Sequence, residues 1–316
     1  MVQKRMTITS LGVPEEMVLQ YDGRSECVAV IGADSFIGAR MTRELSERGR
    51  KVVAFGESPS FPAFKNCVYE VTDYSRFDLP AECNSVVFCH DVAKDRVRHL
   101  QALENLCASL ARSYTPVHQV HLSYFSSSYI CAGGKGTIRE ADGLRPHNLR
   151  ELAICHAEQM LFAWGCMTRG SIVANVFRHG ELYGEKEDWP TPAGYVNESL
   201  ALARRGENVR FSGNLNQLRT LTHVKDLVAA AIAVMDQEFV SGTFNLPGYK
   251  TSAYRCLAAI ARQYGVDFDV TGEAILSDNL LPFSTDCVLS QREFKNMVPQ
   301  FVPRYRFRDW IRTQNA

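Results

Sequence analysis

Cysteine and histidine stand side by side at two places in the chain, and such pairs can combine a nucleophile with a base or ligate a metal. Cys89 and His90 end a predicted strand, and a second pair begins at Cys155 within a predicted helix. Adjacent residues of a strand or helix point in different directions, so neither pair forms a dyad by itself. Cys89 and His90 are therefore candidates for catalysis, and buried, unreactive side chains are the competing interpretation.

A glycine-containing turn between a predicted strand and helix, Val28-Ala-Val-Ile-Gly-Ala-Asp-Ser-Phe-Ile-Gly38, could hold the pyrophosphate of a dinucleotide. The first glycine permits a tight turn, the last lets the helix pack closely, and the helix N-terminus offers N–H groups to an anion. Serine fills the middle position, where its hydroxyl could contact phosphate. The competing interpretation is a turn that binds nothing. The candidate cofactor-binding residues are Gly32, Ser35, Phe36, Ile37 and Gly38.

The end of the second predicted strand should carry an acidic residue that binds the ribose hydroxyls. Gly56 occupies that position, and Glu57 follows it. Glu57 could serve from a slightly altered turn, which favours NAD and leaves NADP open. A solvated loop glutamate is the equally weighted alternative.

Strands and helices alternate through the first part of the chain, which predicts an α/β fold with a Rossmann-type doubly wound parallel sheet. We expect an N-terminal extension over 1–25, a dinucleotide-binding domain over 26–185, and a smaller substrate-type region over 186–316, with some segments returning to the Rossmann domain. The predicted strands are 27–31, 51–55, 67–71, 85–89, 117–123, 171–177 and 243–246, and the predicted helices are 37–48, 94–113, 148–164, 195–204, 223–235, 252–264 and 306–313.

Composition narrows the functional classes. The formal net charge of the 316 residues is zero, which gives no argument for a nucleic-acid or membrane partner. The ten cysteines form no Cys-x-x-Cys pair, so no metal is expected. We find no signal peptide and no apolar run of membrane-spanning length, and a cytoplasmic protein with reduced thiols is the simplest interpretation.

Over about residues 26–313 the chain resembles the extended short-chain dehydrogenase/reductase family of NAD-dependent sugar-nucleotide epimerases and dehydratases. The resemblance implies that Glu70 or Asp73 meets the adenine, that Ser123 lies in the substrate site, and that Arg219 reaches the nucleotide part of the substrate. It also implies a homodimer through helices 94–113 and 148–164. The motifs that carry it are Ile31–Gly38, Val71-Thr-Asp73, Val120-His-Leu-Ser123 with Tyr129, Phe177-Arg178 with Leu182-Tyr-Gly184, Gln217–Asp226 and Thr243–Leu246.

The family's catalytic Tyr-x-x-x-Lys pair is missing, because no tyrosine in the chain is followed four residues later by lysine. Alignment with the family places Arg150 at the tyrosine and Ile154 at the lysine. The same alignment places Phe125 at the catalytic serine or threonine, and a slip of one residue places Ser126 there. Arginine does not deprotonate at physiological pH, and isoleucine cannot lower the pKa of a neighbour. Ordinary redox chemistry should therefore be slow or absent, although Arg150 could bind an anionic substrate group.

Two functional hypotheses follow. The first is a repurposed member of the family that binds a small-molecule or nucleotide-like ligand, with NAD as a possible cofactor, and acts as a non-redox binding, scaffold or regulatory protein of a biosynthetic pathway. The second is an enzyme of sugar-nucleotide or natural-product metabolism with a non-standard acid/base residue. An ordinary epimerase or dehydratase is disfavoured by the missing pair.

Overall fold

The computed structural model describes residues 27–80, 82–92, 95–113, 119–131, 136–168, 171–184, 194–212, 214–237, 240–271 and 286–314. The predicted extension over residues 1–25 lies outside this set. None of the helices within these ranges is long and apolar enough to span a membrane.

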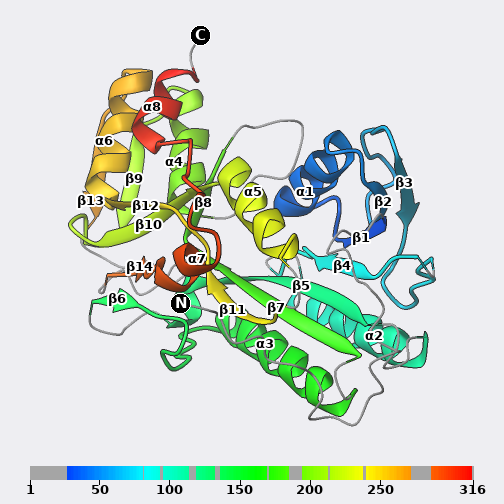
Figure 1. Cartoon of the computed structure of the whole chain (residues 1–316). Coiled ribbons are helices and arrows are strands. Elements are labelled where there is room, and N and C mark those ends of the chain that lie inside the picture. Colours follow the sequence, from blue (N-terminus) through cyan, green and yellow to red (C-terminus); the bar gives the residue numbers. More distant parts are fainter. Residues whose placement is uncertain are drawn as a thin grey trace.

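Seven parallel strands form the central sheet (Figure 1). They are β1 (Cys27–Ile31), β2 (Lys51–Gly56), β3 (Cys67–Val71), β4 (Ser85–Phe88), β5 (Val120–Ser127), β7 (Ile172–His179) and β11 (Gly242–Asn245). Their order is β11-β7-β5-β4-β1-β2-β3, so the direction of winding reverses between β1 and β4. Ligands of doubly wound folds bind outside the carboxyl ends of the strands at such a switch point. The predicted Rossmann-type fold is confirmed.

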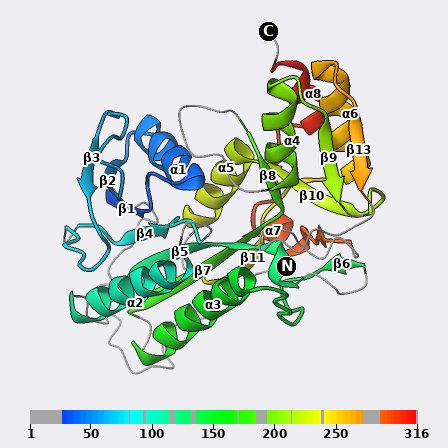
Figure 2. The same cartoon turned by 180° about the vertical axis from the view of Figure 1, so that it is seen from behind.

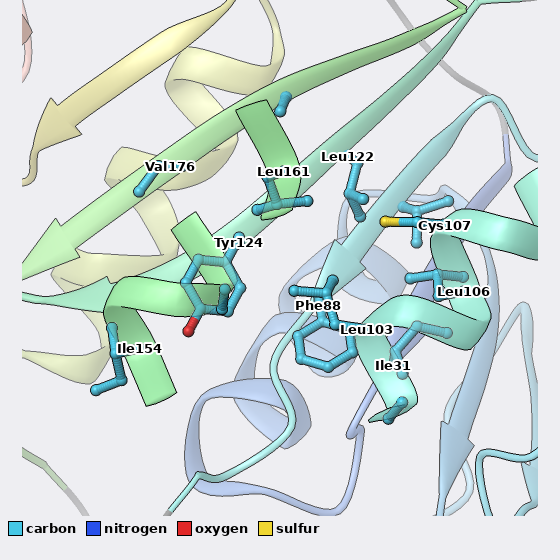
Figure 3. Close-up of a cluster of buried hydrophobic side chains, with 14 of the residues drawn as sticks. Ile31, Phe88, Leu103, Leu106, Cys107, Leu122, Tyr124, Ile154, Leu161 and Val176 are labelled. Carbon is cyan, nitrogen blue, oxygen red and sulfur yellow. The ribbon is translucent and has the colours of Figure 1, made fainter. Parts of the chain in front are cut away.

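Helices cover both faces of the sheet (Figures 1 and 2). Helices α1 (Phe36–Glu47) and α5 (Val224–Met235) lie on one face, and α2 (Arg96–Ser113) and α3 (Leu149–Met167) lie on the other. Side chains of β5 alternate between the two layers: Tyr124 packs in the core under α2 and α3, and Phe125 packs in the core under α1 and α5. Figure 3 shows Tyr124 among Phe88, Leu122 and Leu161 of the first core.

Two glycines fix the first strand–helix turn. Gly32 has φ +77°, and a Cβ there would lie 2.5 Å from the backbone of His90, in the segment that follows β4. A Cβ on Gly38 would collide with the carbonyl oxygen of Gly32. These close approaches allow α1 to begin directly over the end of β1, as the glycine spacing predicts.

The C-terminal region stands at the carboxyl end of the sheet (Figure 1). A core rich in aromatic residues holds together three of its helices and the strands beside them. These elements are α4 (Tyr195–Arg204), α6 (Ala253–Tyr264) and α8 (Phe307–Arg312), the pair β9 (Val209–Ser212) and β13 (Phe268–Thr271), and the sheet of β8 (Glu181–Tyr183), β10 (Leu218–His223) and β12 (Tyr249–Ser252). The short elements η3 (Ser128–Cys131), β6 (Thr137–Ile138), β14 (Val288–Leu289) and α7 (Arg292–Met297) complete the described chain.

Two findings differ from the sequence-based expectations. Strand β5 continues four residues beyond its predicted end at Ser123, because Ser126 and Ser127 pair with Arg178 and His179 of β7. The expectation of reduced thiols fails for Cys27 and Cys83, which the structure joins in a disulfide between β1 and the segment before β4. The remaining cysteines are free.

Candidate functional site

A cavity opens at the carboxyl end of the sheet, where the strand order reverses. One wall comes from the start of α1 and from the segment 89–92 after β4. The opposite wall comes from the first turns of α3, the link between β7 and β8, and the start of α4. The end of β5 forms the floor. The cavity therefore lies between the Rossmann body and the C-terminal region, where a ligand would touch both.

Ser35 is the N-cap of α1. Its Oγ accepts a hydrogen bond from the N–H of Gly38 at 3.0 Å and donates one to the carbonyl oxygen of Cys89 at 2.7 Å. The single hydroxyl proton is thus directed to a backbone carbonyl in this structure, and the contact between this hydroxyl and phosphate stays a prediction. The backbone N–H groups of the first turn, where Phe36 and Ile37 line the cavity, are the remaining donors for an anion.

The end of β2 is acidic, but the acidic group comes from a residue that sequence reasoning missed. Asp34 lies in the glycine turn, and its Oδ2 accepts hydrogen bonds from the N–H groups of Glu57 and Ser58 at 3.1 and 3.0 Å. Glu57 points elsewhere and forms an ion pair with Arg98 of α2, Oε1 to Nε 2.9 Å. An aspartate two residues after the first glycine was the available signal, but spacing alone does not show where its carboxylate lies.

The two other acidic candidates for the adenine end are exposed. Glu70 lies on β3, the edge strand of the sheet. Asp73 Oδ1 accepts hydrogen bonds from the N–H and the hydroxyl of Ser75 at 2.9 and 2.6 Å. These hydrogen bonds lower the pKa of Asp73. Neither residue lines the cavity.

The residues aligned with the missing catalytic groups all line the cavity: Phe125 of β5, and Arg150 and Ile154 of α3. Ile154 is buried in the core beneath α3, and Figure 3 shows it near Tyr124. Arg150 is half-buried and forms no ion pair with any of the described residues. The first turns of α3 thus present a guanidinium and an aliphatic side chain to the cavity.

Ser126, the alternative catalytic serine, belongs to a buried charged cluster. Its hydroxyl donates to Oε1 of Glu158 at 2.5 Å. Arg178 makes a bidentate ion pair with the same carboxylate, Nε to Oε1 3.0 Å and Nη2 to Oε2 2.7 Å. The third guanidinium nitrogen of Arg178, Nη1, donates to the carbonyl oxygen of Glu140. With its proton directed to Glu158, the Ser126 hydroxyl acts as a structural link between β5 and α3.

The thiols near the cavity are poor nucleophiles. Burial raises the pKa of Cys89 far above its ordinary value, and it raises the pKa of Cys131 and Cys155 to about 11 and about 12. Thiolate is the reactive form, so its population at neutral pH is small. Within the described residues, no group of histidine, cysteine and acidic side chains could hold a metal ion.

His90 lines the cavity, and its backbone carbonyl orients a second histidine. That carbonyl lies 3.1 Å from Nδ1 of His99, and Nε2 of His99 lies 3.1 Å from the hydroxyl of Tyr124. A carbonyl oxygen only accepts, so Nδ1 carries the proton and Nε2 accepts from Tyr124. Burial lowers the pKa of His99 to about 3 and raises that of Tyr124 well above its ordinary value, which keeps both neutral. Sequence spacing gave no sign of this chain of hydrogen bonds.

Tyr129 and Glu181 form a second hydrogen-bonded pair in the cavity wall. The Tyr129 hydroxyl donates to Oε2 of Glu181, and both residues line the cavity. Burial raises the pKa of Glu181 to about 8, against the opposing effect of the Arg219 charge. A Cβ on Gly194, the N-cap of α4, would clash with Oε1 of Glu181, so glycine makes room for this carboxyl group. Glu181 can gain or lose a proton near neutral pH.

The two remaining substrate candidates lie away from the cavity. Ser123 is fully buried within β5, and Arg219 of β10 is 2% exposed. Neither lines the cavity. The Arg219 guanidinium lies over the ring of Tyr129, 5.5 Å from its centroid, and donates to Gln217 at 2.7 Å. Tyr129 thus stands between Arg219 and the cavity.

Comparison with solved structures identifies proteins of the same architecture. MoeE5 in complex with UDP-glucuronic acid and NAD superposes with a TM-score of 0.75 at 22% identity, covering 91% of this chain and 97% of that one. UDP-glucose 4-epimerase of Thermus thermophilus with NAD gives 0.73 at 18%, covering 90% and 96%. dTDP-glucose 4,6-dehydratase of Bacillus anthracis with NAD gives 0.73 at 15%, covering 90% and 94%. At these identities the likeness concerns the fold.

A comparison of the sequence with protein-family models assigns the chain to a family. No curated protein matches the chain. The sequence model of the NAD dependent epimerase/dehydratase family matches residues 28–246, which include the glycine turn, the cavity floor and the edge strand β11. The chain therefore belongs to the NAD dependent epimerase/dehydratase family.

Proposed function

We propose that this protein binds NAD and a nucleotide-sugar-like ligand at the cavity and serves a biosynthetic pathway as a non-redox binding, scaffold or regulatory member of its family. The observation that carries the proposal is the pair Arg150 and Ile154 lining the cavity. An open cavity argues for a ligand, and the absence of a proton-accepting side chain at these two positions argues against the usual chemistry.

The residues present fit a dinucleotide. Gly32 and Gly38 give the tight turn, the N-terminus of α1 faces the cavity, and Asp34 supplies an acidic group at the end of β2. NAD supplies a hydride acceptor when it is bound. This chain's own groups would hold the pyrophosphate by backbone N–H groups and the ribose by a carboxylate. The solved relatives were determined with NAD and with sugar nucleotides, which supports the same classes of ligand here.

Binding and turnover measurements test this proposal together. NADH fluorescence should respond to the protein at micromolar concentrations, and calorimetry should detect UDP-glucose or UDP-glucuronic acid. The protein should produce no NADH from NAD with common UDP- or GDP-sugars. Absence of NADH binding would refute the dinucleotide proposal, and brisk turnover would refute the non-redox proposal.

One observation favours an enzyme with a non-standard acid/base group as the second candidate. The Tyr129–Glu181 pair lines the cavity, and the pKa of Glu181 near 8 suits proton exchange at physiological pH. In this candidate the Tyr129 hydroxyl receives a proton from a ligand hydroxyl while passing its own proton to Oε2 of Glu181. Turnover that is lost in both Tyr129→Phe and Glu181→Gln and retained in Arg150→Ala would establish it.

A further inference from the structure

The carboxylate of Asp34 occupies the space of a side chain at the end of β2. A Cβ placed on Gly56, the last residue of this strand, would clash with the Tyr69 hydroxyl of β3 and would lie 2.9 Å from Oδ1 of Asp34. Oδ2 of the same carboxylate is fixed by the N–H groups of Glu57 and Ser58. Gly32 N and Ala33 N both donate to the carbonyl oxygen of residue 55, at 2.9 and 2.8 Å, and tie the turn to the strand. The acidic group is therefore held rigidly from two sides.

The position matters because the second strand of a dinucleotide-binding sheet ends beside the adenosine ribose. An acidic side chain there usually belongs to the strand and accepts a hydrogen bond from the ribose 2′-hydroxyl. In this chain the strand ends in glycine, and the Asp34 carboxylate from the turn lies beside that glycine together with the Tyr69 hydroxyl. An ionised carboxylate only accepts hydrogen bonds, so it matches a hydroxyl and repels a phosphate.

The charged residues near Asp34 also favour a ribose 2′-hydroxyl over a 2′-phosphate. Glu57, the acidic residue next in sequence, is engaged with Arg98 at 2.9 Å. Arg98 also donates to the carbonyl oxygen of Asp73 at 3.3 Å. A guanidinium at this end of the site could otherwise accommodate a 2′-phosphate, but its charge is balanced by Glu57. The carboxylates of Asp34 and Glu57 and the guanidinium of Arg98 together give this end of the site a net negative charge.

We propose that Asp34 binds the adenosine ribose of the dinucleotide and selects NAD over NADP, in the role usually held by a residue of the second strand. This inference rests on the proposed dinucleotide binding. Asp34 acts as a specificity-determining residue, and Glu57 acts only as the partner of Arg98.

Titrations of the full chain with NADH and NADPH, followed by nicotinamide fluorescence, test the assignment. The wild type should bind NADH at least about tenfold more tightly, because a hydrogen bond to a charged group discriminates by that factor or more. Asp34→Asn should remove most of this preference, mainly by weakening NADH. Glu57→Gln, one residue beyond the strand, releases the Arg98 guanidinium and should narrow the ratio only by strengthening NADPH binding, with the affinity for NADH kept within about twofold.

A second measurement requires no variant. ADP-ribose should displace NADH from the wild type better than its 2′-deoxy analogue, and better still than its 2′-phosphate. Equal competition by the three compounds overturns the assignment even if Asp34→Asn does not fold. A preference that survives Asp34→Asn, or an affinity for NADH that falls as far in Glu57→Gln as in Asp34→Asn, also overturns it while leaving dinucleotide binding intact. A wild type that binds neither dinucleotide refutes the proposed function, and this inference with it.

Discussion

Two buried carboxyl groups near the cavity differ in their electrostatic surroundings. Glu158 meets a bidentate guanidinium, and Arg178 and Glu158 side chains are 5% and 2% exposed. Glu181 has a tyrosine hydroxyl as its hydrogen-bond donor and a pKa of about 8. Both are buried glutamates, one on α3 and one on β8, and their different partners give the two carboxyl groups different properties. The first is a structural ion pair, and the second can exchange a proton.

Removal of Glu158 should destabilise the protein strongly. Glu158→Ala leaves the Arg178 guanidinium buried without its partner, which costs about 3–5 kcal/mol in the free energy of unfolding. Urea unfolding measures the change. The matched control is Glu207→Ala, which breaks an exposed ion pair with Arg205 and should leave the unfolding midpoint unchanged. Equal effects of the two variants would contradict the assigned burial of the Glu158–Arg178 pair.

The pH dependence of stability should contain a contribution from Glu181. Its pKa is about 8 in the folded protein and 4.5 without the shift, so the folded state holds a proton that the unfolded chain has lost between these values. The free energy of unfolding should therefore fall as the pH rises from about 4.5 to about 8 and then level off. Glu181→Gln should remove this decline, as measured by urea midpoints at pH 5, 7 and 9. An exposed control, Glu47→Gln, should keep the wild-type profile.

At the scale of elements, the first turns of α3 bring Arg150 and Ile154 to the cavity. Arg150 and Ile154 are one turn apart and face the same cavity, as residues at i and i+4 of a helix must. Asn148 caps the helix by accepting a hydrogen bond from the N–H of Glu151 at 2.9 Å, which fixes where the first turn begins. The cap therefore fixes the positions from which Arg150 and Ile154 reach the cavity.

Restoring the pair should test that geometry. Arg150→Tyr combined with Ile154→Lys should yield some NAD-linked oxidation of a sugar nucleotide, because a lysine one turn away lowers the pKa of the new tyrosine. The appearance of NADH absorbance measures it, and Arg150→Phe with Ile154→Lys is the matched control without a hydroxyl. Buried lysine at position 154 carries a folding cost, so thermal melting must accompany the assay. A folded double variant that binds NADH yet remains inactive would contradict this placement of the pair.

The whole molecule presents apolar side chains on the outer surfaces of α2 and α3. Val97, Phe162 and Met167 are 74%, 48% and 73% exposed. The two helices lie side by side on one face of the sheet (Figure 2). A second copy related by a two-fold axis would bury these side chains in a four-helix bundle, and a C2 dimer is the commonest closed assembly. We propose this homodimer.

Light scattering should give twice the chain mass of 35.4 kDa at micromolar concentration. Phe162→Asp with Met167→Glu should shift the protein to a monomer, because each introduces a charge into an apolar interface. Val302→Glu, at an equally exposed apolar residue of the C-terminal segment, should leave the mass unchanged. A wild-type monomer would contradict the proposed assembly.

The sequence by itself determined the Rossmann fold and the order of its main elements. Buried strands such as Val28–Ile31 are apolar on both faces, and the two glycines of the first turn leave few alternatives for the backbone. Helix α4 appears at its predicted bounds, Tyr195–Arg204. Local pattern is sufficient for such elements because burial and turn geometry act over a few residues. The absence of any Tyr-x-x-x-Lys spacing is likewise a property of the sequence alone.

Only the tertiary structure decided which side chains meet. Short strands such as β8 and β10 escaped prediction because their partners lie about 40 residues apart in the chain. Ser35 turned out to use its hydroxyl on Cys89, and Asp34 rather than Glu57 took the end of β2. Glu181 acquired its raised pKa from burial between segments that are distant in sequence. Hydrogen bonding and desolvation depend on distance in space, which residue spacing along the chain does not specify.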